Sequence, residues 1–384
     1  MRIVLSGSFW CQPIVGSGQY LHGLLRYLPR VAPQHEYILL LPVMVGAVPP
    51  LPPVVAVRYV ATPFDGKNRH SAKLWYEQIG VPQAAAQLRA DVLHIPYAAP
   101  PLQSSVPVVA TVHDIIWLLL PEYRGKATFR AYTKLIPPAA RRAAHILADS
   151  EHSRRDIVQH LGCEPSRVTT VLLAAGDQFH PQPSDQAAAY VQQKYGLKQP
   201  FVYYVGGLDA RKNVSTLIRA FSWMRSAGGP DATLAIAGRA PHADPQIFPN
   251  IDVLIGGLRR QSEIRRIDVP YADSAQLYAA ATIFAFPSRY EGFGLPPLEA
   301  MACGTPTIAA NTSSLAEVVG EAALCVPPDD IVGWVTALWR LLVDTNTRSD
   351  LRQHGLERSR MFSYQRVAQE TLAIYDEVYR QHRY

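Results

Sequence analysis

The sequence predicts an α/β protein with two doubly wound parallel sheets, one in each half of the chain. Three observations lead to this prediction. At 384 residues the chain exceeds the size at which one hydrophobic core stops growing, so two domains are expected. Apolar residues make up 48% and charged residues 18%, which suits a globular chain. Short β-branched runs alternate with helical patterns in two successive series.

The first series has short apolar runs of the kind found in buried parallel strands. These runs are RIVLS at 2–6, EYILLLPV at 36–43, DVLHIPY at 91–97, VPVVATVHD at 106–114 and HILADS at 145–150. Helical patterns lie between them, at 18–31 and 72–90. Strands joined by helices predict parallel pairing, because a parallel connection needs a crossover.

A polar, proline-bearing stretch at 177–200 interrupts the pattern and is the candidate hinge. We place the first domain at 1–178 and the second at 190–363. The final segment, about 364–384, is an amphipathic helix that no strand follows. The second series of predicted strands is FVYYVGG at 201–207, ATLAIAG at 232–238, IFAFPS at 283–288, TPTIAA at 305–310 and AALCVPP at 322–328.

Charge and cysteine content exclude several classes of protein. The formal net charge of +6 favours anionic partners, but no basic run with interleaved aromatic residues indicates nucleic-acid binding. The four cysteines are far apart, without zinc-finger spacing, so reduced thiols are expected. The opening residues lack a signal peptide and no apolar window is long enough to span a membrane, which predicts a cytoplasmic protein.

The first predicted strand is followed by GSGQYLHGLL, in which Gly16 and Gly18 open a helix. The third glycine of the dinucleotide fingerprint is missing, so a nicotinamide cofactor is not expected. The two glycines either turn the chain or let a ligand approach the backbone. Both alternatives place them at the edge of the sheet where open α/β folds bind ligands.

His113 and Asp114 follow a buried strand, at its carboxyl end. A single histidine is more often a core residue than a catalytic one, but this position favours a functional role. His94 has a weaker version of the same position, and we expect it to be structural.

Arg211 and Lys212 come between a strand and a helix that Asn213 is placed to cap. Two cations beside a helix N-terminus form a phosphate site, because the free amides, the helix dipole and the side chains all act on the same anion. The alternative is a solvated Arg-Lys pair.

The stretch FPSRYEGFGLPPLEAMACGTPTI has two glutamates eight residues apart. It predicts a strand, a glycine loop with Glu291, and a helix with Glu299 one turn in, its prolines in the first turn and Gly304 at its end. The amides of Phe293, Gly294 and Leu295 suit a phosphate. One carboxylate then suits the hydroxyls of a ribose, and the other faces the group attached to the phosphates.

These residues resemble the retaining glycosyltransferases of family 4. The resemblance rests on YEGFGLPPLEAMACGTP with its two glutamates, on ARKN upstream and on HD in the first half, and it extends to ADSEHSRRDI, LYAAA and NTSSLAEVVGEAAL. It implies the GT-B fold, in which two Rossmann-like domains face each other across a cleft and the C-terminal helix packs back on the first domain. The first domain would bind the acceptor and the second the nucleotide sugar.

The resemblance also implies roles for single residues. Arg211 and Lys212 would hold the donor diphosphate and Glu299 the ribose, while Glu291 would contact hydroxyls of the donor sugar. His113 would lie against the transferred sugar, with Asp114 beside it in the catalytic set. The backbone of Val269 would meet the base. Gly207 stands where some members have arginine, and Gln19 where many do.

No cofactor or metal is expected, since cations and amides can stabilise the leaving diphosphate and no Asp-x-Asp motif of metal-using transferases is present. The resemblance favours same-face attack assisted by the leaving phosphate, with Glu291 as an orienting group rather than a nucleophile. The alternatives are a nucleotide-sugar epimerase of the same fold and a partner that binds nucleotide sugar without transferring it.

LWYEQIGVPQ at 74–83 and the glutamate segment together are most similar to mannosyl- and rhamnosyltransferases of bacterial surface polysaccharides. GDP-mannose is therefore the expected donor, with UDP-glucose and UDP-N-acetylglucosamine as alternatives, and a glycan or lipid-linked glycan is the expected acceptor. A basic stretch either is solvated or contacts the acidic inner face of the membrane. It includes Arg124, Lys126, Arg130, Lys134, Arg141, Arg142 and Arg155.

Overall fold

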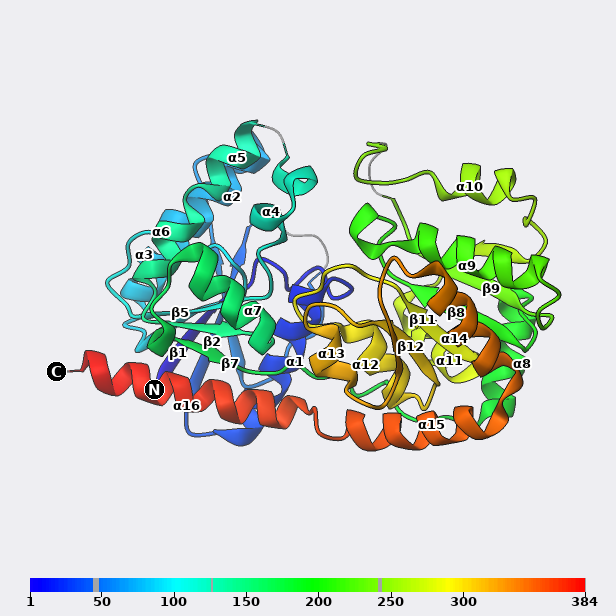
Figure 1. Ribbon diagram of the computed structural model, residues 1–384. Helices are drawn as coiled ribbons and strands as arrows, with labels where there is room; N and C mark the ends of the chain where they lie inside the picture. The colour runs from blue at the N-terminus through cyan, green and yellow to red at the C-terminus, as the bar shows by residue number, and fades with distance from the viewer. Residues whose placement is uncertain (44–47, 126, 241–243, 384) are drawn as a thin grey trace. The chain divides into compact units, whose positions relative to one another are not determined.

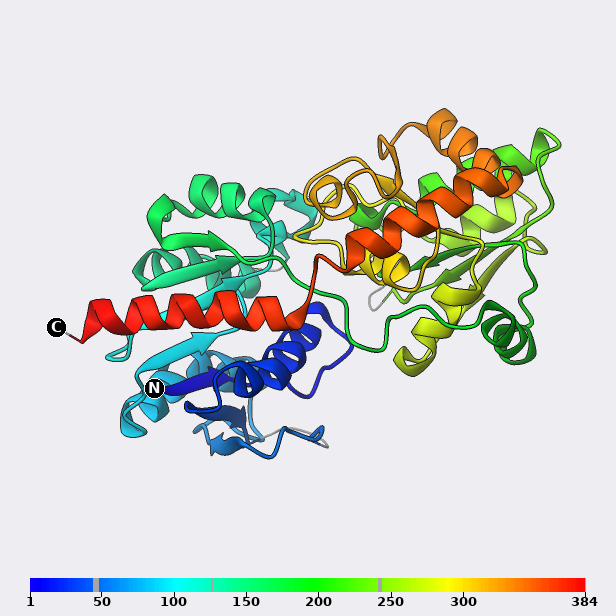
Figure 2. The ribbon, with the colours of Figure 1, turned by 90° about the horizontal axis from the view of Figure 1, so that it is seen from below.

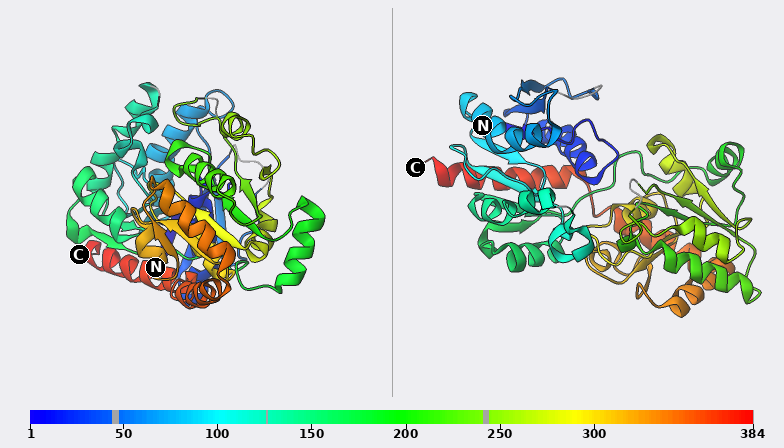
Figure 3. Two further views of the ribbon diagram at one scale, coloured as in Figure 1. Left: turned by 45° about the vertical axis from the view of Figure 1, so that its right-hand side comes forward. Right: turned by 90° about the horizontal axis from the view of Figure 1, so that it is seen from above.

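A computed structural model describes residues 1–43, 48–125, 127–240 and 244–383. The chain divides into two compact units, and each is described by itself (Figure 1). The first comprises Met1–Leu173 and Ser363–Tyr384, and the second comprises Ala174–Phe362. Both ends of the described chain therefore belong to the first unit (Figure 3).

The first unit is built on a parallel sheet in the order β3-β2-β1-β4-β5-β6-β7. Its strands are β1 Arg2–Ser6, β2 Glu36–Pro42, β3 Val55–Val60, β4 Val92–Ile95, β5 Val108–Val112, β6 His145–Ala148 and β7 Val168–Thr170. The order reverses beside β1, so right-handed crossovers place helices on both faces of the sheet. The predicted doubly wound parallel sheet is confirmed.

The helices of the first unit connect these strands. They are α1 Gly16–Val31, α2 Arg69–Trp75, α3 Val81–Gln87, α4 Ile116–Leu119, α5 Ala127–Thr133, α6 Ile136–Arg142, α7 Glu151–Asp156 and α16 Tyr364–His382, with short η1 Tyr76–Gly80, η2 Pro121–Arg124, η3 Ile157–Leu161 and η4 Pro165–Arg167. The single helix expected at 72–90 is divided by a π-helical turn, in which the Val81 amide bonds the Tyr76 carbonyl. Pro82 comes next and has no N–H to continue the regular ladder.

The C-terminal helix α16 packs on α1, β4 and β6 of the first unit (Figure 2). Its Tyr364 hydroxyl donates to the Gln19 carbonyl at 3.2 Å, and its Tyr375 hydroxyl lies 2.5 Å from Nδ1 of His94. A Cβ at Gly23 would lie 2.1 Å from the Tyr364 ring, so glycine there allows the close approach. The expectation that the last helix packs on the first domain is confirmed, and His94 is buried within this contact.

The second unit has a parallel sheet in the order β10-β9-β8-β11-β12-β13. Its strands are β8 Phe201–Val205, β9 Thr233–Ala237, β10 Ile264–Ile267, β11 Ile283–Phe286, β12 Thr307–Ala310 and β13 Leu324–Val326. Its helices are α8 Ser184–Tyr195, α9 Val214–Ser226, α10 Ile251–Gly257, α11 Ser274–Ala280, α12 Leu295–Ala302, α13 Leu315–Val319, α14 Ile331–Val343 and α15 Thr345–Ser359, with short η5 Ala210–Lys212 and η6 Tyr271–Asp273. Helix α9 packs with α14, and α8 with α11.

The stretch at 177–200 is not linker throughout, contrary to the simplest expectation from its polarity. Helix α8 occupies much of it and buries Ala187 and Val191 against the core of the second unit. Its apolar residues are few but fall on one face, and this small stripe is sufficient for packing on α11.

In both sheets the strand order reverses at a defined point, between β1 and β4 in the first and between β8 and β11 in the second. Loops that leave the carboxyl ends of these strands run in opposite directions and open a crevice, where open α/β sheets bind ligands. Each unit therefore offers one ligand-binding edge. No helix of the described chain is both long and apolar enough to cross a bilayer.

Candidate active site

Arg211 and Lys212 lie in η5, directly after β8 and its glycine turn. Gly207 belongs to that turn, and a Cβ there would lie only 2.6 Å from Oδ2 of Asp209. Asn213 precedes α9 as expected, but its side chain does not cap the helix. The left-handed backbone of Asn213 turns that side chain toward the Pro328 carbonyl, to which it donates at 2.7 Å, so the predicted cap is wrong.

The two cations meet Glu291, which follows β11, the neighbouring strand at the reversal point. Arg211 Nη1 lies 2.9 Å from Oε2 of Glu291, and Lys212 Nζ lies 2.7 Å from Oε1. Each carboxylate oxygen therefore has its own cation. The three side chains are almost entirely buried, being 11 or 12% exposed.

Burial alone would raise the pKa of Glu291, but the charges of Arg211 and Lys212 outweigh it and lower the pKa to about 2. Burial lowers the pKa of Lys212, and the carboxylate of Glu291 opposes this effect. Glu291 is consequently ionised at neutral pH. Asp209 also lies 3.4 Å from Nε of Arg211, so two cations and two carboxylates meet here. A further anion would contact the Arg211 and Lys212 side chains, whose positions these carboxylates fix.

The loop that carries Glu291 is held by two serines that the sequence interpretation did not single out. The amide of Glu291 donates to the Ser313 hydroxyl at 2.9 Å. The Ser314 hydroxyl lies 2.8 Å from the Glu291 carbonyl and 2.7 Å from that of Phe293. Both serines belong to the segment NTSSLAEVVGEAAL, which follows β12, the strand next to β11. This position after a strand is the signal by which the sequence could have identified them.

Helix α12 begins at Leu295 after Gly294, whose φ of +115° explains why glycine stands there. Glu299 lies in this helix, against Tyr278, whose hydroxyl donates to Oε2 at 2.7 Å. Burial raises the pKa of Glu299 to about 7. Glu299 therefore titrates near neutral pH, whereas Glu291 does not.

Val269 lies between the end of β10 and η6, partly buried against the core of the second unit. It belongs to the same carboxyl-end edge of the sheet as Arg211 and Glu291. The second unit thus brings Arg211, Lys212 and Glu291 into direct contact and places Glu299 and Val269 on neighbouring elements.

In the first unit, Gly16 begins α1, and a Cβ there would meet no atom within 4 Å. At Gly18 a Cβ would lie 1.9 Å from the Gln12 carbonyl oxygen. Gly18 is therefore required by the turn itself, while the space beside Gly16 is open.

His113 follows β5 and is held by a residue that the sequence interpretation missed. Its Nδ1 lies 2.7 Å from Oδ2 of Asp149, which follows the adjacent strand β6. Burial lowers the pKa of His113, but the charge and hydrogen bond of Asp149 outweigh it, so the pKa is raised. Nε2 of His113 is buried with no hydrogen bond inside the described ranges. Asp149 fixes the ring, and a backbone contact with Pro96 also helps to raise the pKa of His113.

His113 and Asp114 line a pocket of about 230 Å³ with Tyr97 and Trp117. Oδ1 of Asp114 accepts from the Ile116 amide at 3.2 Å, so this carboxylate also shapes the chain after β5. Among the residues that the structure describes, no group of three or more His, Cys, Asp or Glu side chains is arranged to hold a metal ion.

Solved structures first define the class of the fold. Sucrose-phosphate synthase from Thermosynechococcus elongatus matches with a TM-score of 0.78 and 20% identity, covering 99% of this chain and 100% of that one. WaaG, a glycosyltransferase involved in lipopolysaccharide biosynthesis, matches with a TM-score of 0.74 and 16% identity, covering 98% of this chain and 99% of that one. The chain has the GT-B glycosyltransferase fold.

Sequence comparison then gives the family. The model "Glycosyltransferase Family 4" matches residues 14–172, and "Glycosyl transferases group 1" matches residues 189–358. O-antigen chain mannosyltransferase B of Escherichia coli is 33% identical over 269 residues, which are 70% of this chain and 69% of that protein. The serotype-specific mannosyltransferase WbdA of Escherichia coli is 30% identical over 266 residues, 68% of this chain but only 32% of that protein. The chain belongs to the family 4 glycosyltransferases and is a hexosyltransferase.

Proposed function

We propose that this chain transfers mannose from GDP-mannose to a hydroxyl of a glycan or lipid-linked glycan, with retention of the anomeric configuration and without a metal ion. The observation that carries the proposal is the sharing of the Glu291 carboxylate between Arg211 and Lys212 at the reversal point of the second sheet. The similarity to O-antigen chain mannosyltransferase B supports mannose as the sugar.

The paired cations suit the leaving group of this reaction. When the bond between the sugar and the nucleoside diphosphate breaks, negative charge develops on the phosphates. Arg211 and Lys212 are already held in place by Glu291 and by the Tyr290 carbonyl, which accepts from Arg211 at 2.6 Å. Cations fixed in advance need no reorganisation as the charge develops, so they can stabilise the leaving diphosphate themselves.

Glu299 suits the ribose, because a carboxylate accepts hydrogen bonds from neighbouring hydroxyls. The start of α12, from Phe293 to Leu295, offers backbone amides to a phosphate. These are the amides of Phe293, Gly294 and Leu295, since Pro296 and Pro297 follow them and have no N–H.

His113 suits the transferred sugar. Asp149 holds Nδ1 of the ring, and we assign a sugar hydroxyl to the other ring nitrogen, Nε2. Glu291 is committed to two cations and is strongly acidic, which makes it a hydrogen-bond acceptor for hydroxyls rather than a nucleophile. Same-face attack assisted by the leaving phosphate is consistent with this assignment.

A donor panel tests the proposal. The purified chain would be incubated with a manno-oligosaccharide and either GDP-mannose, UDP-glucose or UDP-N-acetylglucosamine, and product would be followed by mass spectrometry. We expect an added hexose with GDP-mannose, and NMR of the product should show the anomeric configuration of the donor. Transfer from a UDP-sugar only would replace the donor assignment, and an inverted product would contradict retention.

A further inference from the structure

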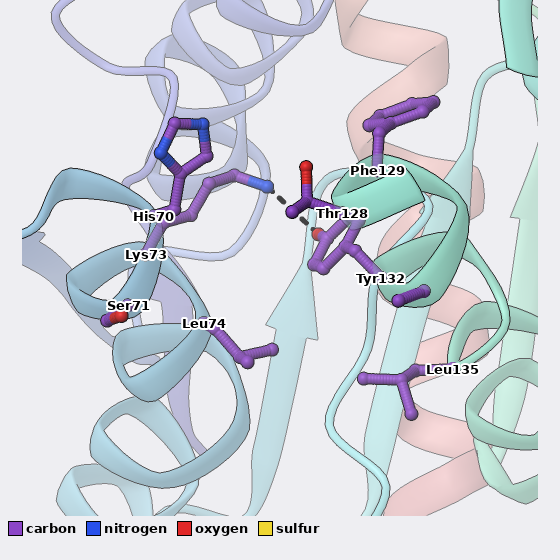
Figure 4. Close-up of a pocket in the computed structure, with 9 residues that line it drawn as sticks. His70, Ser71, Lys73, Leu74, Thr128, Phe129, Tyr132 and Leu135 are labelled. Atoms are coloured by element: carbon purple, nitrogen blue, oxygen red, sulfur yellow. Dashed lines mark hydrogen bonds between the residues drawn. The ribbon is translucent and has the colours of Figure 1, made fainter. Parts of the chain in front are cut away.

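Beside the pocket of His113, the first unit has a larger groove of about 580 Å³ between α2 and α5 (Figure 4). Its walls are mainly apolar. Leu74 from α2 and Leu135, which follows α5, point into it from opposite sides, and Phe129 stands at its upper edge (Figure 4). Leu74 is 39% exposed and Phe129 41% exposed, so both apolar side chains are accessible to a ligand in the groove.

The groove and the pocket of His113 are adjoining spaces. Lys73, Phe129 and Tyr132 line both of them. A sugar beside His113 therefore lies next to the apolar groove, with these three side chains at the boundary.

A polar contact centred on the buried Glu77 holds the two walls of the groove together. Lys73 of α2 donates to the Tyr132 hydroxyl of α5 at 2.9 Å (Figure 4). The same hydroxyl donates to Oε2 of Glu77 at 2.7 Å. The Glu77 side chain is fully buried and lies 3.1 Å from the Lys73 ammonium. This arrangement fixes the spacing of α2 and α5, so the groove is part of the fold rather than a gap between loose helices.

Lys73 lines the groove, and other basic residues lie on or next to the two helices that form it. Lys67 and Arg69 are exposed at the start of α2, and Arg130 and Lys134 are exposed in and after α5. Of the basic stretch noted in the sequence, Lys126 lies outside the described residues, and Arg141 donates to the Leu161 carbonyl. An apolar groove with a basic rim complements an apolar chain that carries a phosphate.

We propose that the groove between α2 and α5 binds the apolar chain of a lipid-linked acceptor, whose sugar lies beside His113 and whose phosphate linkage meets the basic rim. The proposal rests on the proposed function, which it deepens by assigning the acceptor's lipid to a single site. The ligand of the groove is then the chain of one acceptor molecule rather than the surface of a bilayer.

The first test uses alkyl mannosides as acceptors, each below its micelle concentration, with GDP-mannose as donor. KM should fall from methyl to hexyl to octyl mannoside, by up to about fourfold per buried methylene. Leu74→Ser should flatten this series. The matched control is Ile79→Ser, since Ile79 is 40% exposed on the same segment but does not line the groove, and it should keep the slope of the unchanged chain.

The second test needs no transfer, so it separates a failure of the groove from a failure of the proposed function. Calorimetry without donor should show octyl phosphate binding at least tenfold more tightly than inorganic phosphate, with the preference lost in Leu74→Ser and kept in Ile79→Ser. If the protein prefers octyl phosphate but transfers no mannose, the mannosyltransferase assignment is rejected and the groove assignment is kept. The groove assignment is wrong if transfer is active but KM does not change with the length of the alkyl chain. It is also wrong if the alkyl chain lowers KM only when anionic vesicles are added.

Discussion

Glu291 and Glu299 are both buried carboxyls, yet their surroundings give them opposite ionisation behaviour. For Glu291, burial is outweighed by Arg211 and Lys212, and the pKa falls to about 2. For Glu299, burial dominates over the hydrogen bond from Tyr278, and the pKa rises to about 7. The first acid is a permanent anion, and the second changes charge in the physiological range.

This difference predicts how nucleotide binding depends on pH. Since Glu299 is ionised above about pH 7 and protonated below it, its bond to a ribose hydroxyl should strengthen as pH rises from 6 to 8. Between pH 6 and pH 8, calorimetry should show that the affinity for GDP rises by up to about tenfold more in the unchanged chain than in Glu299→Gln, given the strength of charged hydrogen bonds. The variant removes the titrating group and also controls for ionisation of the phosphates. If both proteins show the same pH dependence, Glu299 does not bind the ribose.

The contact of His113 with Asp149 predicts a second effect at the scale of single residues. Asp149→Asn keeps the size of the side chain but removes the charge that raises the pKa of His113, so the histidine should titrate at lower pH. Turnover should fall by about tenfold or more, because a neutral amide, which can also donate, no longer fixes the tautomer and charge of the ring as the carboxylate does. The pH profile of turnover with saturating donor and acceptor is the measurement.

Two further observations distinguish positioning from a merely structural role for Asp149. GDP affinity should be unchanged in Asp149→Asn, since the nucleotide is assigned to the second unit. NMR titration of His113 should show its pKa shifted downward. A variant that loses turnover with an unshifted histidine would contradict the assignment.

At the scale of elements, the packing of α16 on α1 depends on Gly23. A Cβ there would lie 2.1 Å from the Tyr364 ring, so Gly23→Ala must displace the start of α16. Overpacking of this kind costs about 1–3 kcal/mol, which outweighs the gain of about 1 kcal/mol from a better helix former. Thermal unfolding should show a lower Tm for Gly23→Ala and little change for Gly16→Ala, where the space is open. Equal Tm values would show that α16 tolerates displacement.

Strands with a continuous run of apolar residues could be predicted from the sequence, whereas strands without such a run could not. β1 and β11 are buried along their length and stand out in the sequence. β3 has exposed residues in its middle, and β10 reads IRRI with two arginines, so neither has the pattern of a buried strand. Each is at the edge of its sheet, where one side of the strand has no neighbour within it.

The site was predictable to the extent that its residues follow strands in a recognisable segment. Arg211, Lys212 and Glu291 were identified in this way, and the structure brings them into contact. His113 contacts Asp149 because β5 and β6 are neighbours in the sheet. No local sequence pattern predicts which strands are neighbours, so this contact could not be predicted. The same holds for Ser314, whose hydroxyl reaches two carbonyls of the Glu291 loop.

For the whole molecule, we expect transfer to continue in excess EDTA. In the proposed mechanism Arg211 and Lys212 supply positive charge for the leaving diphosphate, which would make a divalent ion unnecessary for that purpose. Initial rates of mannose transfer should agree within about twofold with and without chelator. Loss of activity that Mg²⁺ or Mn²⁺ restores would establish a metal-dependent enzyme.

The central claim is that the cations held by Glu291 form the diphosphate site, and titration of GDP into Lys212→Ala tests it most directly. Removal of a charged hydrogen bond worth about 1.5–3 kcal/mol should weaken GDP binding at least about tenfold. Lys198→Ala is the matched control, because Lys198 is an exposed lysine of the same unit. We predict weakened binding in Lys212→Ala and unchanged binding in Lys198→Ala, and GDP affinity equal to that of the unchanged chain in both variants would contradict the account.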